Sequence, residues 1–137
     1  MPATDSCLPV GIAILAKAPL PGYAKTRLIP VLGAEGAATL QAAMLARTVA
    51  TALAADIGPV TLWCAPDSSH PAFAEARKMG VGLAVQPPCD LGGRMLMALQ
   101  QGLPAGGALV IGTDCPALTP QHLQDAALGL RRHAAVF

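Results

Sequence analysis

The sequence VGIAILAKAPLPGYAKTRLIP (residues 10–30) passes directly from an apolar run to a loop that holds prolines, a glycine and three cationic side chains. Residues 10–16 are apolar on both faces, which is typical of a central strand in a parallel sheet. The loop that follows carries Lys17, Lys25 and Arg27. We therefore expect a buried first strand that ends in a cationic loop.

Outward from this stretch, short apolar runs alternate with longer helix-like segments. The predicted strands are residues 10–16, 60–64, 82–86, 108–112 and 134–137. The first predicted helix spans residues 34–55. A second begins after a serine or His70 and ends at Gly80, and a third begins after Asp90 and ends at Gly102. The last begins at Pro120, with Thr119 as its cap. This β-α alternation predicts one α/β domain over residues 1–137, with helices on both faces of a Rossmann-like parallel sheet.

Composition excludes several classes of function. Nine basic and eight acidic residues give a formal charge of +1, which argues against nucleic acid or a membrane surface as a partner. The chain is 53% hydrophobic, yet we expect no apolar stretch near the ~18 residues of a membrane span. The first nine residues lack the basic cluster of a secretory signal, so we expect a cytoplasmic protein.

Cysteine spacing gives no sign of a metal or redox centre. The four cysteines are far apart and form no C-x-x-C pair, which argues against a zinc knuckle or a thioredoxin-like site. We expect reduced and mostly buried thiols. They are Cys7, Cys64, Cys89 and Cys115.

Ligands of parallel α/β sheets bind outside the carboxyl ends of the strands. Three loops occupy such positions here: residues 17–30 after the first strand, QPPCDLGGRM after the third, and GTDCP after the fourth. All three are predicted to face one cleft.

The first of these loops suits the oxygens of a di- or triphosphate. Lys17, Lys25 and Arg27 supply strong donors, Pro21 limits backbone freedom and Gly22 permits close approach of a ligand. The loop matches neither a Walker A motif nor the G-x-G-x-x-G fingerprint. A solvated basic loop is the structural alternative.

Asp114 and the third-strand loop offer further candidates. Asp114 directly follows the apolar run ALVIGT, where it could hold Mg²⁺ together with phosphate oxygens or could simply bond its own turn. Asp90 and Arg94 could form a helix cap and a side-chain pair, or could border a ligand with Gly92 and Gly93. His70, His122 and His133 are interpreted as surface or capping residues.

Three ordered motifs carry a family resemblance: AKAPLPGYAKTRL, QPPCDLGGRM and VIGTDCPALT. Together they resemble the bacterial glycosyltransferase-like proteins known as radical-SAM/selenodomain-associated transferases. That family is similar to the nucleotidyltransferases that make molybdenum-cofactor dinucleotides and phospholactate-guanosine conjugates. The resemblance implies the nucleotide-diphospho-sugar transferase fold.

The resemblance also implies residue roles. Lys17, Lys25 and Arg27, with Pro21 and Gly22 in the same loop, would hold the phosphates of a nucleoside triphosphate or nucleotide-sugar. Base and ribose would be bordered by Asp90, Gly92 and Arg94. Asp114 would bind Mg²⁺ or Mn²⁺, and with Lys25 would be catalytic. An unidentified acceptor oxygen would then displace pyrophosphate or a nucleoside diphosphate.

The sequence departs from the resembled family at its end. Family members are longer and carry a DGGY-like stretch after the segment that corresponds to HAAVF, residues 133–137. We therefore expect a fold truncated at the carboxyl terminus, with an unpaired sheet edge that favours self-association. Two functional hypotheses stay open: a Mg²⁺-dependent nucleotidyl- or glycosyltransferase, and a nucleotide-binding module without turnover. A purely structural fragment is a third.

Overall fold

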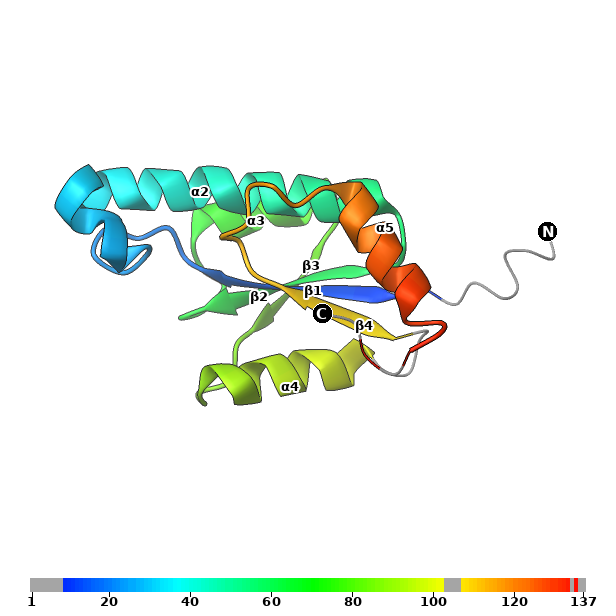
Figure 1. Ribbon diagram of the computed structural model, residues 1–137. Coiled ribbons are helices and arrows are strands. Elements are labelled where there is room, and N and C mark those ends of the chain that lie inside the picture. Colours follow the sequence, from blue (N-terminus) through cyan, green and yellow to red (C-terminus); the bar gives the residue numbers. More distant parts are fainter. Residues whose placement is uncertain (1–8, 103–106, 134, 136–137) are drawn as a thin grey trace.

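The computed structural model describes residues 9–102, 107–133 and 135, which form a four-stranded parallel sheet between helices (Figure 1). The strands are β1 (Gly11–Lys17), β2 (Val60–Ala65), β3 (Gly82–Val85) and β4 (Ala108–Ile111), in the order β3-β2-β1-β4. The predicted α/β fold and its first four strands are confirmed. The fifth predicted strand, residues 134–137, lies outside the described residues except for Ala135.

Helices cover the two faces of the sheet unequally (Figure 1). On one face lie α2 (Ile29–Ala55), α3 (Pro71–Met79) and α5 (Pro120–Gly129), and on the other lies α4 (Leu91–Gly102). The larger core, which includes Ile14, Leu45, Leu62 and Phe73, forms on the α2 face. The buried cluster on the α4 face consists of Ala13, Trp63 and Ala98.

Local signals in the sequence explain where the shorter helices begin and end. His70 accepts a hydrogen bond from the backbone of Ala72 at the start of α3, and Gly80 ends that helix with φ 120°. At the start of α5, Thr119 and His122 form a reciprocal capping box. The predicted caps, including the capping interpretation of both histidines, are confirmed.

Helix α2 begins earlier than residue 34, the predicted start. A short 3-10 helix, η1 (Thr26–Leu28), leads into a first turn from Ile29, and the chain then kinks at Gly33 with φ 75° and ψ 165°. That backbone conformation is essentially restricted to glycine. The regular helix therefore starts after Gly33, and the first turn projects beyond the sheet (Figure 1).

The expectation that no segment has the length and apolarity of a membrane span is wrong. One helical segment, Thr26–Ala55, meets both criteria, with a mean hydropathy of 1.4 over its best window. A core helix of a soluble protein can meet the same criteria. In this fold α2 packs Leu45, Val49 and Ala52 into the core. The cytoplasmic location stays a prediction.

The expectation of mostly buried thiols is also wrong. Cys64, at the inner end of β2, is buried, whereas Cys89 and Cys115 are exposed. Cys7 lies outside the described residues. Both exposed cysteines belong to loops after strands, where tertiary structure and not residue type decides burial.

Candidate functional site at the carboxyl edge of the sheet

The loops after β1, β3 and β4 all leave the same edge of the sheet, because the strands are parallel. This edge lies on the left in Figure 1, where the first turn of α2 and the amino end of α4 are also found. β4 and β3 are opposite outer strands, with β1 and β2 between them. The loop after β1 is thus the neighbour of the loop after β4.

Lys25 and Asp114 meet across these two neighbouring loops. The Lys25 Nζ atom donates a hydrogen bond to Asp114 Oδ1, and the two form an ion pair. The Lys25 side chain is 9% exposed and that of Asp114 is 83% exposed. Asp114 thus bonds a residue 89 positions away, and its predicted role in metal binding stays a prediction.

The other residues predicted to bind phosphate belong to the same loop or directly precede it. Lys17 is the last residue of β1, and its ammonium lies 5.3 Å from the centre of the Tyr23 ring in the loop that follows. Gly22 has φ 81°, and a Cβ added there would meet nothing within 4 Å. Arg27 and Pro21 are exposed. These residues lie in or directly before the loop that carries Lys25, and their role as phosphate ligands stays a prediction.

The loop after β3 is held by its own hydrogen bonds. Asp90 Oδ1 accepts from the backbone of Gly93 at 2.8 Å, so it caps α4 as the structural alternative predicted. Arg94 donates to the Cys89 carbonyl at 2.8 Å and to Gln86 Oε1 at 3.1 Å. Among the described residues the Arg94 side chain therefore bonds Gln86 and Cys89, whereas Arg94 bonds Asp90 only through its backbone N–H, which donates to the Asp90 carbonyl at 3.0 Å.

Gly92 and Gly93 in this loop differ in how much space a side chain would have. A Cβ on Gly93 would lie 2.8 Å from Cys89 Sγ, so packing alone accounts for glycine there. A Cβ on Gly92 would meet Asp90 Oδ1 at 3.8 Å, an ordinary contact. Packing therefore gives no reason for glycine at position 92, and its predicted place beside a ligand stays a prediction.

Two glutamines that sequence reasoning missed connect the loops. Gln41 of α2 is 3% exposed, and its Nε2 donates to the Lys17 carbonyl at 2.9 Å and more weakly to Thr113 Oγ1 at 3.4 Å. Gln86 Nε2 donates to the carbonyls of Trp63 at 2.8 Å and Ala16 at 3.3 Å. Gln41 could have been singled out from the sequence, because it is a polar residue on the buried face of the alanine-rich segment 34–55.

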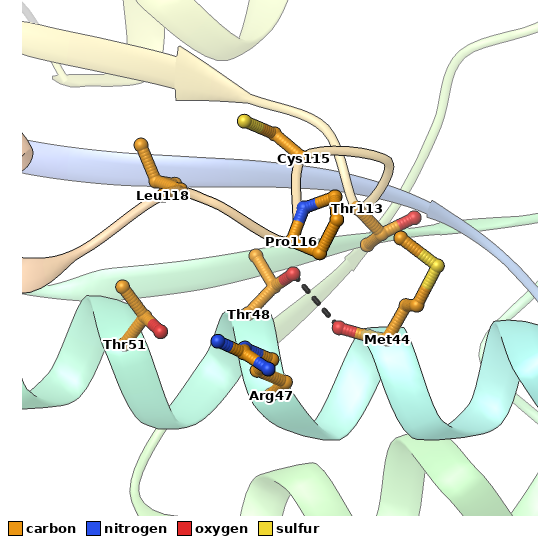
Figure 2. Close-up of a pocket in the computed structure, with 8 residues that line it drawn as sticks. All are labelled: Met44, Arg47, Thr48, Thr51, Thr113, Cys115, Pro116 and Leu118. Carbon is orange, nitrogen blue, oxygen red and sulfur yellow. Dashed lines mark hydrogen bonds between the residues drawn. The ribbon is translucent and has the colours of Figure 1, made fainter.

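Two cavities of the described residues lie beside the sheet, and neither Lys25 nor Asp114 lines them. A crevice of about 10 Å³ separates α2 from the loop after β4, between Thr48 and Pro116 (Figure 2). It could hold one water molecule. A groove of about 290 Å³ lies on the α4 face, between Trp63, Ala84 and Ala98. The predicted single cleft shared by the three loops stays a prediction.

Comparison with known proteins adds a family and a fold. The family model described as "Uncharacterized protein conserved in bacteria (DUF2064)" matches residues 48–137, which is more than half of the chain. The chain belongs to the DUF2064 family. No curated protein matches the sequence significantly.

A solved structure matches this member of the DUF2064 family over most of its length. It is that of a "putative nucleotide-diphospho-sugar transferase" from Desulfovibrio desulfuricans G20, with a TM-score of 0.73 and 27% sequence identity. The match covers 89% of this chain and 54% of that one, so the chain spans about half the length of that protein. The expected nucleotide-diphospho-sugar transferase fold is confirmed. The narrower radical-SAM/selenodomain assignment stays a prediction.

Proposed function

We propose that this chain carries the donor site of a Mg²⁺-dependent transferase that uses a nucleoside triphosphate or a nucleotide-sugar. The observation that carries the proposal is the contact between Lys25 and Asp114, which joins a cationic loop and an exposed carboxylate at the carboxyl edge. That edge is where ligands of parallel α/β sheets bind. The similarity to a solved protein described as a nucleotide-diphospho-sugar transferase supports the same donor class.

Each cationic side chain has a defined task in this proposal. Lys25, Lys17 and Arg27 would bind phosphate oxygens and neutralise the charge that develops on the leaving group. Each charge-assisted contact contributes about 1.5–3 kcal/mol, so three of them could hold a nucleotide at micromolar strength. Chemistry of this kind depends on position and charge more than on a covalent intermediate.

The residues present fit a metal ion held partly by the ligand. No group of three His, Cys, Asp or Glu side chains comes together among the described residues, so a metal cage made by protein alone is absent there. Mg²⁺ usually takes one or two carboxylates and completes its shell with phosphate oxygens and water. Asp114 is largely exposed and would be that carboxylate. Bound there, the ion would stabilise charge on the phosphates.

A nucleotide-binding module without turnover is the second candidate. It is favoured by the presence of one carboxylate, that of Asp114, in the described Lys25–Asp114 contact. Release of pyrophosphate or nucleoside diphosphate by the purified chain distinguishes the two. Tight binding without such release across a panel of acceptor alcohols and phosphates would favour the module.

The proposal is tested by thermal unfolding of the purified chain with ATP, GTP, CTP, UTP, UDP-glucose and GDP-mannose, each with and without Mg²⁺. A ligand that binds only the folded state raises the melting temperature by mass action. We expect at least one of these donors to do so, with a larger shift when Mg²⁺ is present. No shift with any donor would contradict the proposal.

Two substitutions assign the effect to the site. Lys25→Ala should weaken triphosphate binding about 10- to 100-fold and nucleoside binding much less, because the lost contact is to phosphate. Asp114→Asn should remove the Mg²⁺-dependent part of the shift with little change in fold. Lys78→Ala and Glu75→Gln are matched controls, because these residues form an exposed ion pair on α3. Unfolding of Asp114→Asn would mark Asp114 as a structural residue instead.

A further inference from the structure

Gln41 is an unusual residue for its place in the fold. It lies in the alanine-rich helix α2 and is 3% exposed, near the buried Ala37 and Ala38. An amide buried in apolar surroundings is costly unless it forms hydrogen bonds. An apolar side chain would serve the packing of α2 without that cost, so the amide needs another explanation.

The hydrogen bonds of Gln41 supply this explanation. Its Nε2 atom donates to the carbonyl of Lys17, the last residue of β1, and contacts the hydroxyl of Thr113, which directly precedes Asp114. The Thr113 hydroxyl in turn lies 3.5 Å from Gln41 Oε1. One buried side chain therefore connects the two loops that carry Lys25 and Asp114.

The backbone does not provide this connection itself. The ladder between β1 and β4 runs from Gly11 and Ala108 to Ile14 and Ile111, where β4 ends. β1 continues to Lys17, paired only with β2 in the described sheet. If the register continued, Lys17 would lie opposite Asp114. The Gln41 amide thus spans the gap where the ladder between β1 and the loop after β4 stops.

We propose that Gln41 is a positioning residue that sets the spacing between the loop after β1 and the loop after β4. In this role it fixes the Lys17 carbonyl and Thr113, and through them the approach of Lys25 to Asp114. The effect on nucleotide and Mg²⁺ binding rests on the function proposed above, whereas the effect on the loops does not. Two separate measurements can therefore test the two parts.

Hydrogen exchange of the free chain tests the positioning role without any ligand. Gln41→Met keeps the length of the side chain but removes its donors, and Thr113→Val removes the hydroxyl. Loss of a buried hydrogen bond should speed exchange of the hydrogen-bonded loop amides of Tyr23, Ala24 and Leu118 about tenfold. Amides of β2 should change no more than in the control.

The matched control is Thr48→Val. Thr48 lies two turns along the same helix and is 7% exposed, and among the described residues its hydroxyl bonds the Met44 carbonyl of its own helix (Figure 2). This variant loses a buried hydrogen bond within α2. Because Thr48 faces the loop after β4 across the crevice, the comparison uses the amides of Tyr23 and Ala24 in the loop after β1. Thr113→Ser, which retains the hydroxyl, should restore slow exchange. Uniformly faster exchange in Gln41→Met and Thr48→Val alike would reduce Gln41 to a core residue and overturn the proposal.

Titration with the four nucleoside triphosphates in the presence of Mg²⁺ tests the functional consequence. Gln41→Met should weaken binding about tenfold relative to the wild type, whereas Thr48→Val should leave it unchanged. If the wild type binds none of these nucleotides and neither UDP-glucose nor GDP-mannose, the proposed function fails, and the exchange experiment alone decides the positioning role. Faster loop exchange with unchanged nucleotide affinity would overturn the link between positioning and binding.

Discussion

At the scale of single residues, Lys25 shows how a strained backbone can serve a site. It adopts a left-handed conformation with φ 49° and ψ 47°, directly before η1. A lysine in this conformation is sterically strained, whereas a glycine would not be. The conformation places its ammonium against Asp114. Alanine pays a similar penalty, so Lys25→Ala removes the charge without a large change in backbone preference.

The buried thiol of Cys64 should make the free energy of unfolding decrease at high pH. Burial, and secondly the negative charge of Asp67, raises the pKa of the Cys64 thiol from 9.0 to about 11. Between these values the folded chain keeps the thiol proton while the unfolded chain releases it, so rising pH favours unfolding. The free energy of unfolding should fall by about 2 to 3 kcal/mol between pH 9 and 11 from this group.

Urea unfolding at several pH values measures this dependence. The Cys64→Ala variant should show a shallower decline over the same window, because it lacks the buried thiol. Below pH 9 the two proteins should have parallel profiles. Identical slopes above pH 9 would show that the thiol does not contribute.

At the scale of elements, the kink in α2 separates a packing helix from the turn that faces the site. The regular part, after Gly33, buries Leu45, Val49 and Ala52 against the sheet. The turn before Gly33 exposes Val31 and Leu32 and follows directly on Lys25 and η1. A single glycine conformation therefore sets the direction in which the cationic loop joins the helix.

Gly33→Ala should destabilise the chain by about 1 to 3 kcal/mol, the usual cost of forcing a side chain into that backbone region. A Cβ at position 33 would meet nothing within 4 Å, so the cost would be conformational and not steric. Urea unfolding measures it. Gly112→Ala is the matched control, because that position also has open space and no positive φ. Equal stabilities of the two variants would contradict the strain argument.

At the scale of the whole molecule, the described sheet has two outer strands, β3 and β4. In addition, its α4 face carries the groove of about 290 Å³ beside Trp63. Exposed apolar side chains, Leu91 and Leu96, project from α4 itself. Unpaired edges and apolar surface favour association between chains.

We therefore expect the purified chain to self-associate in proportion to its concentration. Sedimentation velocity between about 1 and 100 μM should show a rising average mass, because association of this kind follows mass action. Added salt should have little effect, since the surfaces concerned are apolar and the net charge is +1. A monomer at every concentration would contradict this expectation.

Much of the fold could be predicted from the sequence, because its signals are local. The apolar run at residues 10–16, the caps at His70 and Thr119, and the terminating Gly80 act through neighbouring backbone and were placed correctly. The extent of α2 before Gly33 and the exposure of Cys89 and Cys115 were missed. They depend on loop paths that no local pattern encodes.

The sequence by itself determined the alternation of strands and helices, and it singled out Lys25 and Asp114 by their place after apolar runs. Only the tertiary structure decided that these two side chains meet, and that Gln41 joins their loops from a third element. The physical reason is distance along the chain. Contacts between residues 24 or 89 positions apart depend on how strands are ordered in the sheet, which residue periodicity does not specify.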